Sequence, residues 1–131
     1  GVFYCCQAAL PGMIHRKSGR IINISSMWGQ VGASCEVHYS AAKAGVIGLT
    51  RALAKEVGPS GICVNAIAPG VIDTEMNAAL DAATTRALCD ETPLERLGTP
   101  DDVARAAEFL AGPGGAFVTG QILGVNGGFI I

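Results

Sequence analysis

The chain has 131 residues, which is long enough for one domain with a buried core, and its formal net charge is -2. That weakly negative charge gives no reason to expect a nucleic acid or an anionic membrane as a partner. No apolar run approaches the roughly 20 residues that span a bilayer, and no signal-peptide pattern is present. We therefore expect a cytoplasmic protein.

Five cysteines occur, at positions 5, 6, 35, 63 and 89. Because their number is odd and no Cys-x-x-Cys pair is present, we expect no zinc site and a reduced, intracellular chain. Cys63 falls in an apolar run and is predicted to be a small core residue, whereas Cys35 falls in a loop and is a candidate for solvent exposure.

The first part of the chain predicts a helix followed by a buried strand. Half of all residues are hydrophobic and only 5% are aromatic, which favours a tightly packed α/β protein. Apolar residues from Val2 to Ile14 recur at steps of three and four, which predicts an amphipathic helix despite Pro11. Residues 20–25 follow as a strand, and its consecutive apolar residues predict burial on both faces, as in a parallel sheet.

A serine, a tyrosine and a lysine follow in a pattern that suggests acid chemistry. Ser26 closes the strand, where a hydroxyl faces the crevice in which open α/β sheets hold ligands. A helix is predicted over residues 37–57, and its Tyr39 and Lys43 are four residues apart, so they lie one turn apart on one face. An ammonium within roughly 4–6 Å favours the phenolate and makes a tyrosine a better proton donor. Each pattern alone is common by chance, and only their ordered combination indicates a catalytic site.

The same helix carries a stripe of small residues, which consists of Ala41, Ala44, Gly45 and Gly48. Such a stripe lets another helix or a sheet approach closely. The residues alone leave open whether the stripe packs on a second subunit or on the chain's own sheet.

A second buried strand is predicted over residues 62–68, and the alternation of strands with helices indicates a right-handed crossover into a parallel sheet. Pro69 and Gly70 follow at its carboxyl end, where glycine permits a ligand to approach the backbone. Thr74 can bond such a ligand while it starts a helix. A simple turn and helix cap is the alternative.

The last third of the chain begins with its least regular segment. Residues 75–98 mix loop with helix, as substrate lids often do, although an ordinary surface helix explains them equally well. Thr99, Pro100 and two aspartates then predict a helix start, and we assign these carboxylates to the helix rather than to catalysis. Residues 121–125 are the last predicted strand, and residues 126–128 the turn after it.

Four motifs in this order resemble the short-chain dehydrogenase/reductase family, and within it the bacterial 3-oxoacyl-[acyl-carrier-protein] reductases. They are GRIINISS at 19–26, YSAAKAG at 39–45, VNAIAPG at 64–70 and NGGF at 126–129. The resemblance implies an α/β fold, namely the carboxyl-terminal part of a Rossmann-like doubly wound parallel sheet with flanking helices. We expect residues 1–131 to be the carboxyl-terminal half of a single NAD(P)-binding domain, with a glycine-rich pyrophosphate turn and a catalytic asparagine upstream of Gly1.

The resemblance also implies roles for individual residues. Tyr39 is expected to protonate the substrate oxygen, Ser26 to hold that oxygen, and Lys43 to bind the nicotinamide ribose and tune Tyr39. The turn formed by Pro69, Gly70, Ile72 and Thr74 is expected to meet the cofactor, with the Ile72 backbone and Thr74 at the carboxamide and a nearby phosphate. Residues 75–98 are the expected mobile lid, and no metal is expected.

The function implied is the reduction of a ketone to a secondary alcohol by NADPH, with NADH as a possible alternative. The most similar relatives imply a 3-oxoacyl thioester on a carrier protein. Residues 27–29 and 35–38 also resemble reductases of 5-aminopentanonyl-lysine on elongation factor P, where Glu36 can pair with an amine. A homodimer or homotetramer is expected, and a non-catalytic oligomerisation fragment is the alternative of another class.

Overall fold

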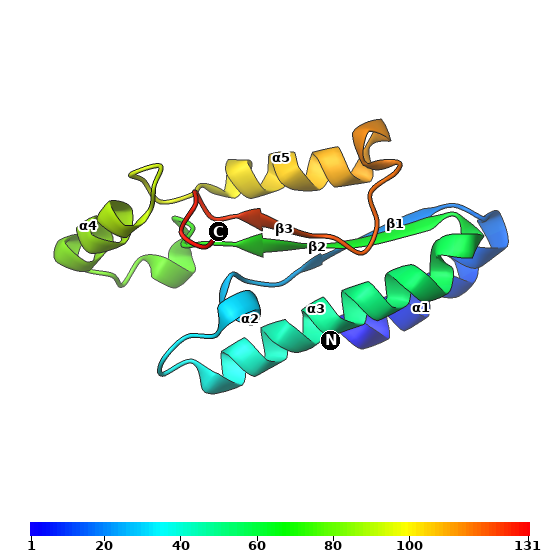
Figure 1. The fold of residues 1–131 in the computed structure, drawn as a ribbon, viewed down its shortest axis with the longest axis horizontal. Helices are drawn as coiled ribbons and strands as arrows, with labels where there is room; N and C mark the ends of the chain where they lie inside the picture. The colour runs from blue at the N-terminus through cyan, green and yellow to red at the C-terminus, as the bar shows by residue number, and fades with distance from the viewer.

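The computed structural model describes residues 1–131 as a parallel sheet of three strands with helices on both faces (Figure 1). The strands are β1 (Gly19–Ile24), β2 (Ile62–Pro69) and β3 (Ile122–Val125). The α-helices are α1 (Val2–Arg16), α2 (Trp28–Val31), α3 (Val37–Val57), α4 (Ala82–Glu91) and α5 (Pro100–Ala111). Short 3-10 helices are η1 (Gly58–Ser60), η2 (Glu75–Asn77) and η3 (Pro113–Gly115).

The strands lie in the order β1-β2-β3, and both pairs are parallel. Figure 1 shows α1 and α3 on one face of the sheet and α5 on the other. This arrangement confirms the predicted α/β architecture. It also brings the carboxyl ends of all three strands to one edge, where the segments that follow them meet.

The core lies between β1, β2 and the two helices α1 and α3. It contains Cys6, Ile21, Leu53, Ala54, Val57, Ile62 and Val64. The central strand is the most buried element, since Val64, Ala66, Ile67 and Ala68 are fully shielded from solvent. Such continuous burial explains why residues 62–68 read as an uninterrupted apolar run.

Two expectations about packing were wrong or only partly right. In β1 only Ile21 and Asn23 are buried, and Ile24 is 46% exposed, because β1 is an edge strand. Cys63 is half-buried rather than a core residue, with its Sγ 3.7 Å from the Ala116 carbonyl oxygen.

The small-residue stripe of α3 does not pack on the chain's own sheet. A Cβ atom added at Gly45 or Gly48 would have no atom within 4 Å. The buried face of α3 consists instead of Ile47, Thr50, Leu53, Ala54 and Val57. The stripe is therefore exposed on the opposite side of the helix.

The irregular segment of residues 75–98 contains η2 and α4, and α4 projects beyond the carboxyl ends of β2 and β3 (Figure 1). The helix start at Thr99 is confirmed, because Thr99 and Asp102 form a reciprocal capping box at the beginning of α5. No helix in the structure combines the length and the apolar character needed to cross a membrane.

Candidate active site

Backbone hydrogen bonds hold together the loops at the carboxyl edge of the sheet. The Met27 N–H donates to the Pro69 carbonyl oxygen at 3.0 Å, which joins the loop after β1 to the end of β2. The Gly70 N–H donates to the Val125 carbonyl oxygen at 2.9 Å, which joins that turn to the end of β3. The predicted site residues therefore stand on one connected framework.

Tyr39 and Lys43 lie side by side on α3, as their spacing predicts. The Lys43 Nζ is 5.5 Å from the centroid of the Tyr39 ring, and both side chains are half-buried. The ammonium donates to the Ile24 carbonyl oxygen at 3.1 Å, so the lysine reaches back to the last residue of β1. This bond places a positive charge next to a phenol at the end of the strand that leads to Ser26.

The two serines after β1 have different environments. The Ser25 hydroxyl donates to the Lys43 carbonyl oxygen at 2.8 Å and so ties the strand end to α3. The Ser26 Oγ accepts from the Trp28 N–H at 3.2 Å, and its own hydrogen has no acceptor within the chain. Ser26 is buried and still has a hydrogen to donate, so it suits the role of holding a substrate oxygen better than Ser25 does.

The turn after β2 has backbone donors available for a ligand, and Ile72 carries one of them. The Ile72 N–H donates no hydrogen bond within the chain, while the Ile72 carbonyl oxygen accepts from the Asn77 Nδ2 at 2.7 Å. Thr74 is exposed and precedes η2, but its side chain does not cap that helix. A free amide and an exposed hydroxyl, with the Lys43 ammonium on α3, suit the polar groups of a nicotinamide nucleotide.

Glycine at position 70 suits the approach of a ligand, and it is also needed for packing within the chain. A Cβ atom there would lie 2.8 Å from the Asn126 Cα, so glycine lets the turn after β3 pack against the turn after β2. The Asn126 side chain fixes that last turn, because its Oδ1 accepts from the Gly128 N–H at 3.0 Å.

Sequence reasoning missed two contacts that shape the site. A Cβ atom at Gly29 would lie 2.7 Å from the Lys43 carbonyl carbon, so α2 approaches α3 at the lysine itself. The Trp28 ring meets the Phe129 ring edge-on, with centroids 5.8 Å apart, which brings the chain's last turn next to the Ser26 loop. Both contacts join distant segments, and no local pattern signals them. Glu36, which was expected to pair with an amine, and His38 are both exposed at the start of α3.

A family model described as enoyl-(acyl carrier protein) reductase matches residues 1–130. The uncharacterized oxidoreductase YmfI of Bacillus subtilis (strain 168) is 50% identical over 120 residues, which are 92% of this chain and 50% of that protein. The 3-oxoacyl-[acyl-carrier-protein] reductase FabG of Pseudomonas aeruginosa is 50% identical over 122 residues, which are 93% of this chain and 49% of that protein. The chain thus spans about half the length of the curated relatives it matches.

A solved structure resembles this chain in fold over almost its whole length. The gluconate 5-dehydrogenase of Burkholderia cenocepacia J2315, in complex with NADP and tartrate, superimposes with a TM-score of 0.93 at 41% identity. The match covers 98% of this chain and 51% of that one. With a family model that covers nearly every residue and relatives that are 50% identical over more than nine tenths of it, the chain belongs to the short-chain dehydrogenase/reductase family.

Proposed function

We propose that the intact protein is an NAD(P)H-dependent ketoreductase that converts a ketone to a secondary alcohol. The observation that carries this proposal is the contact of the Lys43 ammonium with both the Tyr39 ring and the end of β1. The contact supports the proposal because it sets a cation beside a phenol at the edge where open α/β sheets bind ligands, and Ser26 follows the same strand.

In the proposed reaction Tyr39 donates its phenolic proton to the carbonyl oxygen as negative charge develops there. Ser26 donates a hydrogen bond to the same oxygen, and the Lys43 ammonium holds the ribose and stabilises the phenolate that Tyr39 becomes. A bound nicotinamide cofactor supplies the hydride that the carbonyl carbon accepts. Tyr39 then recovers its proton from solvent, which balances the reaction.

We propose a 3-oxoacyl thioester on a carrier protein as the substrate and NADPH as the preferred cofactor. The support is the identity to the Pseudomonas reductase, together with the NADP in the similar Burkholderia structure. The amino-ketone alternative rests on Glu36, whose exposed carboxylate stands at the start of α3, close in sequence to Tyr39.

The test is an assay of the purified intact protein with NADPH or NADH against an acetoacetyl thioester and an amino-ketone. We expect NADPH oxidation with the thioester. Ser26→Ala removes one donor to the developing oxyanion and is expected to lower kcat by about 10²–10³-fold. Ser18→Ala, an exposed serine after α1, is the matched control and is expected to leave kcat unchanged.

If the protein reduces the amino-ketone and not the thioester, the proposed substrate is wrong, but the proposed reaction, reduction of a ketone, stands. Absence of turnover with any ketone and either cofactor would contradict the enzyme and favour the non-catalytic oligomerisation role.

We also propose that the intact protein is a homo-oligomer that pairs through α3. The support is the exposed stripe of small residues, where Gly45 and Gly48 leave open space for the backbone of a neighbouring helix. A dimer or a tetramer satisfies this geometry.

A further inference from the structure

Residues 72–98 leave the sheet edge and return to it through a closed neck. At this neck, the outgoing limb is Val71, Ile72 and Asp73, and the return limb is the segment of residues 94–98. The Asp73 N–H donates to the Gly98 carbonyl oxygen at 2.8 Å, and the Gly98 N–H donates to the Val71 carbonyl oxygen at 2.9 Å. A Cβ atom at Gly98 would lie 2.5 Å from the Ile72 Cδ1 and 3.6 Å from the Val71 carbonyl oxygen, so the two limbs pack closely at this point.

The projecting part of this segment is held by little else. No residue of η2 or α4 is buried, and neither helix packs extensively against a strand or another helix. Asp81 caps α4 from within the segment, through a 2.7 Å hydrogen bond from the Thr84 N–H. The position of α4 relative to the sheet is therefore set by the neck and the return limb.

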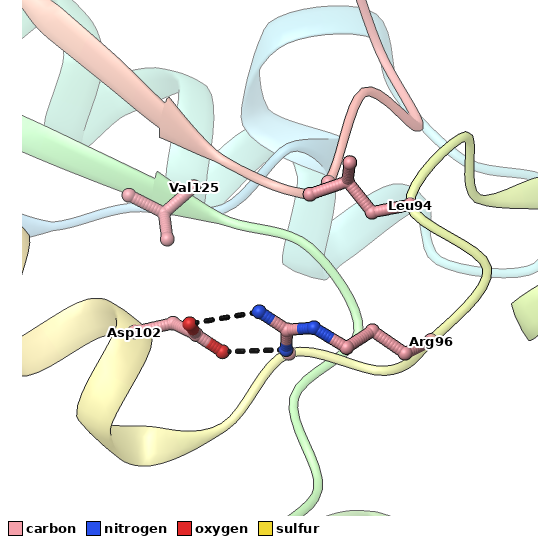
Figure 2. A pocket seen from close by; sticks show the side chains of 6 residues that line it. Leu94, Arg96, Asp102 and Val125 are labelled. Carbon is pink, nitrogen blue, oxygen red and sulfur yellow. Dashed lines mark hydrogen bonds and ion pairs between the residues drawn. The ribbon is translucent and has the colours of Figure 1, made fainter.

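The return limb is fastened to α5 by a two-bond ion pair. The Arg96 Nη1 lies 2.7 Å from the Asp102 Oδ2, and the Arg96 Nη2 lies 3.0 Å from the Asp102 Oδ1 (Figure 2). Two parallel bonds between a planar guanidinium and a carboxylate fix orientation as well as distance. The Arg96 Nη1 also donates to the Leu97 carbonyl oxygen at 2.9 Å, so the side chain braces its own limb.

Asp102 is itself immobilised. Its Oδ2 accepts from the Thr99 N–H at 2.7 Å and from the Thr99 hydroxyl at 2.9 Å. Asp102 belongs to the first turn of α5, and that helix is anchored on the sheet through the fully buried Leu110. A chain of contacts thus runs from the sheet through α5 and Asp102 to Arg96.

Apolar packing beneath the return limb is incomplete. A small cavity of about 90 Å³ lies between the limb, α5 and the end of β3, and Leu94, Arg96, Asp102 and Val125 line it (Figure 2). Beside the ion pair, Leu94 contributes one backbone bond, from its N–H to the Gly127 carbonyl oxygen at 3.2 Å. Since this gap leaves the limb without apolar contacts on that side, the ion pair adds two directed bonds between the limb and α5.

We propose that Arg96 is a positioning residue, which through its paired bonds to Asp102 sets where η2 and α4 stand at the carboxyl edge of the sheet and so governs binding of the keto substrate. The keto substrate named in this inference is taken from the proposed function. The contacts of Arg96 that carry the inference do not depend on that function. Arg96 touches neither substrate nor reacting atoms; it acts through the segment it holds.

The chain offers a matched control on the same helix. Arg105 and Asp101 form an ion pair with an Nε–Oδ2 distance of 2.7 Å, four residues apart within α5, and with side chains 77% and 68% exposed. The Arg96 and Asp102 side chains are 51% and 31% exposed. Arg105→Met removes a cation from α5 without touching the neck.

The test compares Arg96→Met, Arg96→Lys and Arg105→Met in the intact protein. For Arg96→Met we expect the KM of the keto substrate to rise roughly tenfold while kcat changes less than about twofold, since ground-state and transition-state binding weaken together. Arg96→Lys is expected to recover part of the substrate binding that Arg96→Met loses. Its ammonium keeps a positive charge near Asp102 but cannot form the two directed bonds of a guanidinium. Arg105→Met is expected to match the unsubstituted protein.

Hydrogen exchange gives a readout that needs no catalysis. In Arg96→Met the amides of Asp73 and Gly98 are expected to exchange about tenfold faster, because the neck opens more often, while the β2 amides keep their protection. If Arg96→Met behaves as Arg105→Met in both KM and exchange, the positioning role is wrong. If the unsubstituted protein reduces no ketone, the proposed function fails, and exchange at the neck alone decides the role of Arg96.

Discussion

Lys43 is held from three directions at the level of single residues. Its carbonyl oxygen accepts from the Ser25 hydroxyl, its ammonium donates to the Ile24 carbonyl oxygen, and its backbone lies against Gly29. None of these neighbours is proposed to take part in the reaction. They fix the lysine so that its charge stays beside Tyr39.

Gly29→Ala tests this support. The new methyl group would lie 2.7 Å from the Lys43 carbonyl carbon, so α2 and α3 must separate. Overpacking of this kind typically costs about 1–3 kcal/mol, and we expect the free energy of unfolding to fall by that amount in urea titration. We also expect kcat to fall, because Lys43 moves.

Gly12→Ala is the control for this substitution. Gly12 lies within α1, and an added Cβ would meet only the far end of the Arg16 side chain. Alanine in a helix interior is expected to raise stability by about 0.5–1 kcal/mol. Equal effects of both substitutions would show that the α2–α3 contact at Lys43 has no special role.

Asp102 provides a residue-scale prediction about pH. Hydrogen bonds from the Arg96 guanidinium, and then from Thr99, hold the pKa of the Asp102 carboxyl far below its usual range. Since the folded pKa lies below the unfolded value of about 3.9, the stabilising contribution is complete above that value and is lost as the pH falls through the lower folded pKa.

In an NMR titration the Asp102 carboxyl carbon is therefore expected to show no protonation step near pH 3.9, a pH where ordinary aspartates are about half protonated. Arg96→Met should move the midpoint up toward the ordinary value, because it removes the largest cause of the depression. An ordinary midpoint in the unsubstituted protein would contradict the ion pair.

At the scale of elements, α4 and α5 are both capped helices but are attached differently. Thr99 caps α5, which lies against the sheet through Leu110, whereas Asp81 caps α4, which has no buried residue. A cap contributes to global stability only when its helix unfolds together with the core.

We expect Thr99→Ala to lower the free energy of global unfolding by about 1 kcal/mol, the usual effect of losing an N-cap. Asp81→Ala removes the same kind of cap and is expected to leave the unfolding midpoint in urea unchanged, while proteolysis within residues 82–91 becomes faster. A matching loss of global stability in both variants would show that α4 folds as part of the core.

At the scale of the whole molecule, local patterns predicted most elements. The spacing of apolar residues, and the glycines and prolines that end helices and strands, are signals that lie within a few residues of each other. The elements α3, β2 and the start of α5 were therefore predictable from the sequence. The proximity of Tyr39 and Lys43 followed from helical geometry alone. Ser26 was expected to hold the substrate oxygen, and that role stays a prediction; the Ser25 hydroxyl, in contrast, is bonded to the Lys43 backbone.

Contacts between distant segments were not predictable in this way. Nothing near Gly29 or Trp28 in the sequence indicates their packing against Lys43 and Phe129. Asp102 was recognised as part of a helix start, but its pairing with Arg96 depends on the path of the return limb. The burial of β1 was overestimated because a local apolar run does not show which strand lies at the edge of a sheet.

The proposed oligomer can be tested through the exposed face of α3. Gly45→Arg places a bulky cation where an added Cβ meets no atom of the chain, so we expect the fold to persist in circular dichroism. The molar mass from light scattering is expected to fall to that of a smaller assembly. Ala83→Arg, an exposed position on α4, is the control. An unchanged mass for Gly45→Arg would exclude this face from the interface.

The central claim is that Tyr39 is the proton donor of a carbonyl reduction, and the chain's other tyrosine offers a direct comparison. Tyr4 is 71% exposed on α1 and keeps its ring against Phe3. Turnover of a keto substrate by the intact protein is measured for Tyr39→Phe and Tyr4→Phe. We expect Tyr39→Phe to lose activity by at least about 10²-fold, because general acid catalysis contributes that much or more, and Tyr4→Phe to retain it. Equal turnover by Tyr39→Phe and the unsubstituted protein would contradict the assignment.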